Sequence, residues 1–249
     1  DAQKKPPVVS VLGIDVGLES LTANAQLSYD EAGNVSRVQR VKTPNPRHLR
    51  KAEKKLAQAQ KELARKQKGS SNRNKARVKV AKCHSKVART RLHEYRLLAR
   101  LWLSDNQAVA IEGLSILGLC RAGAHNAAGR GLRKSVHDAA WGTLLAQLHY
   151  YAELWGRDII TIDRFAPTSQ TCCVCGVRDG KKPLDVRVWE CGSCGTVLDR
   201  DWNACMNILL SAGLADTACG VDVRRAVGHA DCGEAGTSGS RETPRPVAA

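Results

Sequence analysis

The stretch VLGIDVGLESLTANAQL, residues 11–27, decides the fold that this chain can adopt. Its first half is apolar apart from Asp15, and apolar and polar residues alternate from Leu21 to Leu27. Such alternation is typical of a strand with one buried face. We therefore predict two strands here and a third over residues 35–41, after a D-E-A-G-N turn. An ionised carboxylate between apolar neighbours is costly unless a cation or hydrogen-bond donors hold it, so Asp15 is a candidate functional residue.

Short strands and helices alternate further along the chain. The apolar run AVAI ends on Glu112, and residues 158–162 form another short apolar strand. Apolar residues at helical spacing predict helices over residues 139–155 and 201–214, whereas the residues 115–134, rich in Gly, Ala and Arg, are predicted to be a loop. Strands and helices that alternate around a few buried strands predict an α/β fold.

Three acidic residues stand at positions that suit a metal site: Asp15 within a strand, Glu112 at a strand end and Asp201 at a helix start. Mg²⁺ prefers oxygen ligands, and two such ions about 4 Å apart hold the attacking and leaving oxygens of a phosphodiester. Each residue also has a simpler interpretation. Asp15 would be a turn residue before a glycine, and Glu112 a solvated strand end. Asp201 would be a helix N-cap, and Asp199 competes with it for either role.

Two C-x-x-C pairs follow the last predicted strand of this fold. Thiolates separated by two residues reach one ion from a tight turn, and two such turns close a tetrahedral zinc site. Gly176 and Gly195 follow the pairs, where the turn needs a residue that tolerates positive φ. A closed four-thiolate site is structural, so this zinc is expected to fold a small module. The predicted zinc ligands are Cys172, Cys175, Cys191 and Cys194.

The net charge of +15 comes from one segment, residues 47–103, which holds 19 lysine or arginine residues and three glutamates. Leu49, Leu56 and Leu63 recur every seven residues and predict one helix of an antiparallel pair, with a break at residues 69–72. A charge run is often only a solvated face, but this excess is one-sided and indicates nucleic-acid contact. Aromatic residues are scarce at 4%, which favours phosphate contacts over base stacking. The predicted contacts are Lys54, Lys55, Arg65, Lys66, Arg73 and Lys75.

Composition excludes several classes of protein. There is no apolar stretch long enough for a membrane span, and no secretion signal accompanies the ten cysteines, which indicates a reducing compartment. Four reduced structural cysteines remain the alternative to the zinc site, and disulfides are disfavoured. An ATPase built on Gly13 to Gly17 is disfavoured because no G-x-x-x-x-G-K phosphate loop occurs.

Taken together, the motifs resemble the TnpB family, the OrfB-type proteins of bacterial insertion sequences and relatives of the type V CRISPR effectors. The motifs in order are G-I-D-V-G, N-P-R-H-L-R-K-A-E-K-K-L, A-I-E-G-L, S-Q-T-C-C-V-C-G and D-R-D-W-N-A-C-M-N-I. The resemblance covers about residues 11–212 and corresponds to the C-terminal portion of the family. It implies an RNase H-like RuvC nuclease whose catalytic carboxylates match Asp15, Glu112 and Asp201.

The resemblance also implies a function. Family members are transposon-associated RNA-guided DNA endonucleases, often called transposases, that cut DNA by two-metal phosphodiester hydrolysis. We therefore expect Mg²⁺ as catalytic cofactor, Zn²⁺ as structural cofactor, guide RNA and DNA as partners, and a bacterial cytoplasmic location near the nucleoid, without a membrane. Two alternatives are open: a truncated remnant that binds nucleic acid without cutting it, and a strand-transfer transposase of the same fold.

The expected organisation places a nuclease domain over residues 1–167 and 198–214. A basic helical hairpin is inserted in it at 47–103, and a zinc-ribbon module interrupts it at 168–197. Residues 215–249 are expected to be a disordered tail. The resemblance implies an upstream oligonucleotide-binding barrel in the family, which we expect this sequence to lack. Cys205 stands where the family usually has alanine, and Gly113 where an acidic residue is common.

Overall fold

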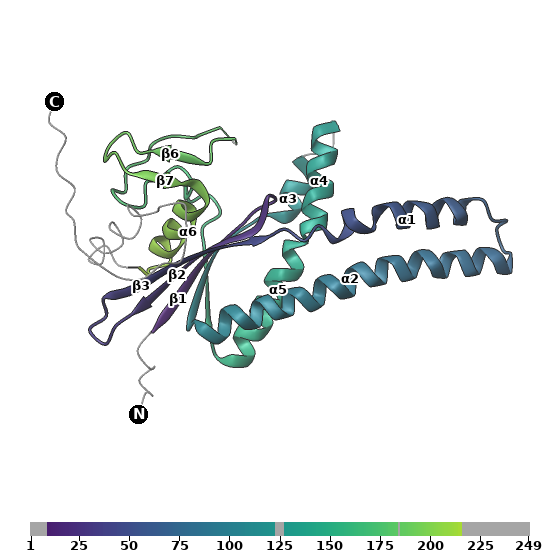
Figure 1. Cartoon of the computed structure of the whole chain (residues 1–249), viewed down its shortest axis with the longest axis horizontal. Coiled ribbons are helices and arrows are strands. Elements are labelled where there is room, and N and C mark those ends of the chain that lie inside the picture. The colour runs from purple at the N-terminus through teal and green to yellow at the C-terminus, as the bar shows by residue number, and fades with distance from the viewer. Residues whose placement is uncertain (1–8, 123–126, 184, 216–249) are drawn as a thin grey trace.

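A five-stranded sheet forms the centre of the molecule in the computed structural model, which describes residues 9–122, 127–183 and 185–215 (Figure 1). The strand order is β3-β2-β1-β4-β5. The first three strands pair antiparallel, and β1, β4 and β5 run parallel. The strands are β1 (Ser10–Val16), β2 (Ser20–Tyr29), β3 (Val35–Pro44), β4 (Ala108–Glu112) and β5 (Asp158–Ile162). The predicted mixed α/β class is therefore confirmed.

The parallel register brings two candidate carboxylates to the same edge of the sheet. Ile14 on β1 is opposite Ile111 on β4. Asp15 and Glu112 are the next residues on these strands, so both lie where the parallel strands approach their carboxyl ends. Ligands of open α/β sheets bind at such edges.

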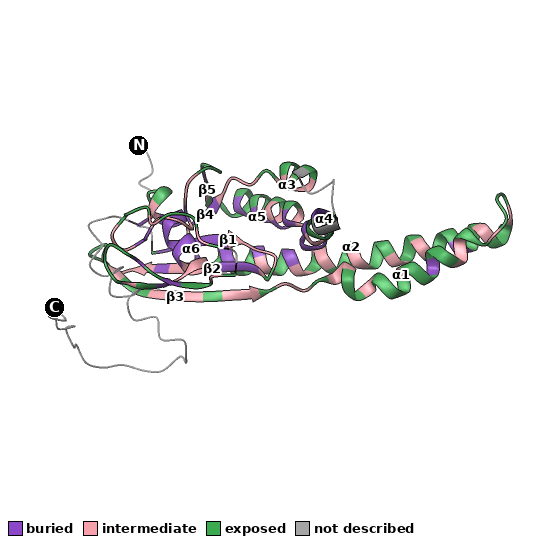
Figure 2. Cartoon of the chain, turned by 90° about the horizontal axis from the view of Figure 1, so that it is seen from above, coloured by how far each residue is buried: buried purple, intermediate pink, exposed green. Residues whose placement is uncertain are grey.

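Helices cover both faces of the sheet, and buried residues concentrate at these contacts (Figure 2). On one face lie α2 (Ser71–Asp105) and α5 (Trp141–Trp155), which pack against Leu12 and Ile14. On the other lies α6 (Arg200–Ser211), which packs against Val11. Because side chains alternate along a strand, Asp15 points to the α6 side, as do Ala108, Ala110 and then Glu112 on β4.

Gly13 allows α6 to approach β1 closely. A Cβ atom at this position would lie 2.6 Å from the carbonyl oxygen of Cys205 and 2.8 Å from Leu209 Cγ. We expect Gly13→Ala to destabilise the fold by about 2 kcal/mol, because the backbone of α6 must move to admit the methyl group. Thermal unfolding measures this loss. Gly131→Ala is the matched control, since nothing lies within 4 Å of its added Cβ and alanine raises the helix propensity of α4 (Ala127–Ala139). Equal melting temperatures for Gly13→Ala and Gly131→Ala would contradict the prediction.

The basic segment forms the predicted antiparallel hairpin, α1 (His48–Ala64) with α2, which projects from the sheet (Figure 1). Ser70 caps α2 by accepting a hydrogen bond from the Arg73 amide at 3.2 Å. The Arg73 guanidinium closes the turn by donating from Nη1 to the carbonyls of Leu63 at 3.2 Å and Lys66 at 3.0 Å. The predicted break between the two helices is therefore confirmed.

The prediction of a loop over residues 115–134 is wrong. The described residues there form α3 (Ile116–Ala122) and α4 (Ala127–Ala139). Glycines lower helix propensity, but burial of Val136 and Ala139 in the core outweighs that cost. The Asp138 carboxylate, at the end of α4, also accepts hydrogen bonds from the amides of Leu49 at 2.7 Å and Arg50 at 3.1 Å in the first turn of α1. It therefore takes the place of an N-cap side chain for α1 from a distant part of the chain.

Two further expectations concern the rest of the chain. The predicted disordered tail beyond Ala215 lies outside the described residues. None of the helices in the described ranges combines the length and the apolar character that a membrane crossing requires.

Candidate functional site

The four predicted zinc ligands converge on one point. Their Sγ atoms all lie within 4.8 Å of one another, and the pairs Cys172–Cys194 and Cys175–Cys191 are each 3.7 Å apart. A tetrahedral zinc ion with Zn–S bonds of about 2.3 Å needs sulfur atoms about 3.8 Å apart. The thiols therefore fit a structural zinc ion.

The two turns that present these thiols have the same backbone design. Gly176 donates to the carbonyl of Cys172 and Gly195 to that of Cys191, each at 2.8 Å. Their φ angles are 75° and 69°, as predicted from the position of each glycine. The second turn joins β6 (Val188–Glu190) to β7 (Val197–Asp199), a two-stranded sheet. Two equivalent turns facing each other are what a four-thiolate site requires.

The pKa values of two of these thiols are shifted in opposite directions. Burial acts to raise the pKa of Cys194, but hydrogen bonds with Thr196, Cys175 and Cys191 together outweigh it, and the pKa is lowered to about 7. Burial raises the pKa of Cys172 above its ordinary value. Because the thiolate is the ligand, the site should release protons as it binds zinc.

A cavity of about 380 Å³ lies at the sheet edge beside α6, where Asp15 and Glu112 share its lining. The segment between β5 and the first cysteine turn forms one wall and includes Arg164 and Gln170. Arg178 of the cysteine module and Arg200 of α6 complete the basic lining. Two carboxylates surrounded by three arginines suit a site that binds a cation and a phosphate group together.

The carboxylates repel one another in this cavity. Burial, followed by the negative charges of Glu112 and Asp201, raises the pKa of Asp15 to about 7, although Arg200 and Lys42 oppose the shift. Burial also raises the pKa of Glu112. The ionised form of Asp15 is therefore costly in the protein alone, and a divalent cation would remove that cost. These oxygen donors fit a hard ion such as Mg²⁺.

Asp201 lies near this pair but is held differently. Its Oδ2 pairs with Lys42 Nζ at 2.9 Å and its Oδ1 lies 3.8 Å from Arg187 Nη1. It does not belong to the cavity lining, and among the residues the structure describes only the cysteine set gathers three or more such ligand atoms within 4.8 Å. Asp199 is the N-cap of α6, accepting from two amides of its first turn at 3.0 and 3.1 Å.

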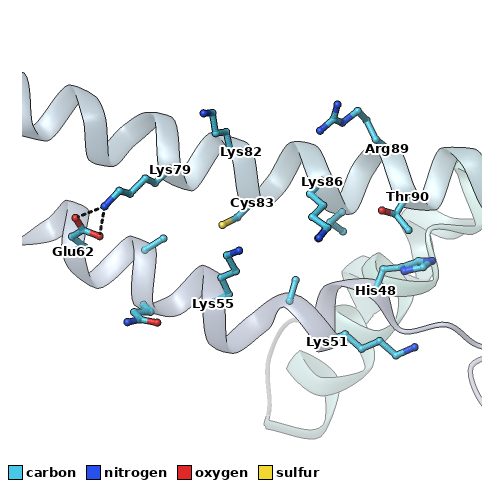
Figure 3. A pocket seen from close by; sticks show the side chains of 14 residues that line it. His48, Lys51, Lys55, Glu62, Lys79, Lys82, Cys83, Lys86, Arg89 and Thr90 are labelled. Carbon is cyan, nitrogen blue, oxygen red and sulfur yellow. Dashed lines mark hydrogen bonds and ion pairs between the residues drawn. The ribbon is translucent and has the colours of Figure 1, made fainter.

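The predicted nucleic-acid contacts divide into two groups on the hairpin. Lys54, Lys55, Arg65 and Lys75 are exposed and Lys66 is partly exposed, whereas Arg73 is engaged in closing the turn. A groove of about 840 Å³ runs between the helices, and basic side chains from both line it (Figure 3). The basic groove residues are His48, Lys51, Lys55, Lys79, Lys82, Lys86 and Arg89. Most of these were not predicted, because the sequence does not show which lysines of a basic helix face its partner.

Two asparagines were also missed. Asn203 accepts from the Cys173 amide at 2.9 Å and donates to the carbonyls of Thr168 and Thr171 at 3.1 and 2.8 Å. Asn207, one turn later on α6, donates to the same two carbonyls at 2.7 and 2.6 Å. Their four-residue spacing was the available signal, since it places both on one face of a helix. They join the helix to the start of the cysteine module.

Cys205 and Gly113, the two residues that differ from the family's usual pattern, are accommodated in the structure. Cys205 is fully buried and donates from Sγ to the Ala23 carbonyl at 3.0 Å. Gly113 donates to the Ile162 carbonyl at 3.1 Å, and a Cβ there would lie 2.9 Å from the same oxygen. A small residue at 113 therefore suits the close approach of the chain to β5.

Comparison with known proteins finds two family models and several curated relatives that are similar to this chain. Residues 1–122 match the family model described as "Probable transposase", of the OrfB type, and residues 141–208 match "Cas12f1-like, TNB domain". A "Putative RNA-guided DNA endonuclease" of Streptomyces pristinaespiralis is 38% identical over 219 residues, which cover 88% of this chain and 49% of that protein. A similarly described Mycobacterium tuberculosis protein is 28% identical over 202 residues, 80% of this chain and 41% of its own length. The chain thus spans half or less of these curated relatives.

Solved structures share the fold at low sequence identity. The Cas12f1–sgRNA–target DNA complex superimposes with a TM-score of 0.55 at 17% identity, covering 82% of this chain and 39% of the Cas12f1 chain. The mini-RNA-guided endonuclease CRISPR-Cas_phi3 gives a TM-score of 0.54 at 11% identity, with 82% and 45% coverage. The mixed α/β architecture is therefore that of Cas12 effectors.

Proposed function

The chain belongs to the TnpB family, and from this premise we propose that it is the nuclease portion of an RNA-guided DNA endonuclease. The observation that carries the proposal is the arginine-lined cavity that holds Asp15 and Glu112 at the edge of the parallel strands. The sheet order, with three antiparallel strands followed by two parallel ones, supports an RNase H-like RuvC core. Residues 1–167 and 198–214 would form that core, and residues 168–197 a zinc ribbon.

Asp15, Glu112 and Asp201 would hold catalytic Mg²⁺. When bound, the metal lowers the pKa of the attacking water and stabilises the leaving oxygen. The side chains of Arg164, Arg178 and Arg200 would neutralise and position the phosphate beside the carboxylates. The cavity therefore combines the two charge types that phosphodiester hydrolysis requires.

Cleavage assays test this proposal directly. The zinc-loaded chain is incubated with end-labelled single- and double-stranded DNA. Each incubation is done with and without guide RNA transcribed from the end of the insertion sequence, called the element here. Cleavage with Mg²⁺ that EDTA abolishes is expected. Binding without cleavage under every condition would favour the alternative of a binding module, whereas joined products from supplied element ends would favour strand transfer.

The groove between α1 and α2 is our proposed surface for a nucleic-acid backbone, together with the exposed Lys54, Arg65 and Lys75 and the partly exposed Lys66. Within the groove lining the one carboxylate is Glu62, which pairs with Lys79 at 3.0 Å. The His48 ring pairs with Glu94 on α2. The other basic groove residues make no ion pair with the residues that the structure describes, so they are available for phosphates: Lys51, Lys55, Lys82, Lys86 and Arg89. The groove offers positive charge but no Phe, Tyr or Trp side chain for base stacking. We therefore expect nucleic-acid binding that depends strongly on salt concentration and little on nucleotide sequence.

Replacing groove lysines should weaken binding and flatten its salt dependence. The variant changes Lys51, Lys55, Lys82 and Lys86 to glutamine. Each lost phosphate contact lowers the slope of log K against log salt by about 0.7 to 0.9, so the slope should fall by about 3. Fluorescence anisotropy with labelled RNA and DNA between 50 and about 300 mM salt measures it.

A second hairpin variant with the same loss of charge provides the control. It changes Lys61, Lys68, Arg77 and Arg100, which are exposed outside the groove, to glutamine. The slope of log K against log salt should fall less than half as much in this control as in the groove variant. Equal losses in the two variants would contradict a groove site and would indicate a diffuse attraction to the whole hairpin.

A further inference from the structure

Lys42, near the end of the edge strand β3, lies beside Asp201, the third carboxylate of the proposed metal site. Its Nζ is 2.9 Å from Asp201 Oδ2 and 3.0 Å from Asp199 Oδ2. The exposed fractions of these side chains are 31% for Lys42, 24% for Asp201 and 18% for Asp199. Partial burial makes this arrangement stronger than an ion pair on the open surface.

The other groups around Asp201 leave Lys42 as its nearest cation. Arg187 lies farther away, at 3.8 Å, and also pairs with Glu19. Asp199 already uses Oδ1 to cap α6. Asp201 does not belong to the cavity lining, but its negative charge contributes to the raised pKa of Asp15. The lysine therefore neutralises the carboxylate that the proposed metal site would need.

We propose that Lys42 is an internal counter-ion that competes with divalent metal for Asp201 and so sets the metal affinity of the site. This inference rests on the proposed metal site. An ammonium group 2.9 Å from a ligand oxygen occupies that oxygen and repels a second cation. The ring of Trp202, whose centroid lies 5.1 Å from Lys42 Nζ, and the Asp199 carboxylate would still hold the ammonium once Asp201 is released.

Mn²⁺ binding to the zinc-loaded chain tests the proposal without requiring activity. Isothermal titration calorimetry compares the unmodified chain with Lys42→Met and Lys42→Arg. Lys42→Met should lower the dissociation constant for Mn²⁺ about tenfold, because a competing positive charge is lost. Lys42→Arg keeps the charge and should bind like the unmodified chain. Lys134→Met removes a lysine paired with Glu53 elsewhere and should change nothing.

Each outcome decides a different point. Binding that disappears in Asp15→Asn but is unchanged or weaker in Lys42→Met would overturn the role of Lys42 while leaving the metal site intact. Mn²⁺ binding that does not depend on Asp15 would overturn both proposals. Circular dichroism melting accompanies each titration, and if Lys42→Met does not fold, Lys42→Gln replaces it with the same expected tightening.

Discussion

Asparagine in place of Asp15 should abolish Mg²⁺-dependent cleavage and, at the same time, stabilise the metal-free protein. A lost ligand in a metal-assisted phosphoryl transfer removes several kcal/mol of transition-state stabilisation, so we expect the cleavage rate to fall about a thousandfold. Asparagine keeps the size of the side chain but carries no charge to be buried. The melting temperature in EDTA at pH 8 should therefore rise by about 4 to 8 °C.

The sign of the stability effect follows from the direction of the pKa shift. The pKa of Asp15 is raised from 3.8 to about 7 in the folded chain. Between these values the folded state binds more protons than the unfolded state, so stability falls as pH rises and levels off above about 7. Burial is the largest cause of this shift, and the charged groups that also act on the Asp15 pKa are Glu112 and Asp201, which raise it, and Arg200 and Lys42, which lower it. The advantage of Asp15→Asn should thus be small at pH 4 and largest at pH 8.

Controls separate this effect from a general loss of negative charge. Asp105→Asn removes an exposed carboxylate just before β4, at the opposite edge of the sheet, and should alter neither cleavage nor the pH dependence. Added Mg²⁺ should raise the melting temperature of the unmodified chain and much less that of Asp15→Asn. Persistent Mg²⁺-dependent cleavage in Asp15→Asn would show that the active site lies elsewhere.

Local signals in the sequence were enough for the strands and the cysteine turns. The alternation from Leu21 to Leu27 and the spacing of the cysteines each depend on neighbours along the chain. The predicted strand is confirmed, and the four cysteines cluster as their spacing indicates, while the zinc ion itself stays a prediction. The helices at 116–122 and 127–139 were missed because burial of Val136 and the contact of Asp138 with α1 depend on a distant segment. Tertiary contacts can override weak helix propensity.

The candidate site was predictable in its composition but not in its arrangement. A position within an apolar strand, a strand end and a helix start identified Asp15, Glu112 and Asp201, respectively, as candidates. The parallel register explains why the first two share a cavity. The position of the Asp201 carboxylate depends on Lys42, which is 159 residues away in the chain, as the numbering shows. No local pattern reports which basic residue of β3, among Arg37, Arg40 and Lys42, will meet a given aspartate. The assignment of all three carboxylates to one metal site stays a prediction.

Loss of both α6 asparagines should detach the cysteine module from the α/β core. With Asn203→Leu and Asn207→Leu together, the Cys173 amide and the carbonyls of Thr168 and Thr171 lose the partners that they have in the core. Each buried polar group left unpaired costs about 1 to 3 kcal/mol. We expect about 4 kcal/mol of destabilisation in total, with a melting temperature about 10 °C lower.

The same variant should lower activity through the wall of the cavity. Thr168 lies in the segment that lines the cavity with Arg164 and Gln170, so release of this segment should displace groups that face Asp15. Cleavage measured well below the melting temperature should fall at least about tenfold, since small misplacements of catalytic groups are costly. Zinc release to a chromogenic chelator should become faster, because the first cysteine turn is no longer held by α6.

Single variants and a surface control make the coupling testable. Asn207→Leu alone leaves both carbonyls paired with Asn203, so its effect should be well below half that of the double variant. Asn74→Leu changes an exposed asparagine on the hairpin and should leave stability and zinc release unaltered. A double variant that loses stability but keeps both its zinc-release rate and its cleavage rate would refute the coupling. The asparagines would then serve packing alone, and the cavity wall would be held from the sheet side.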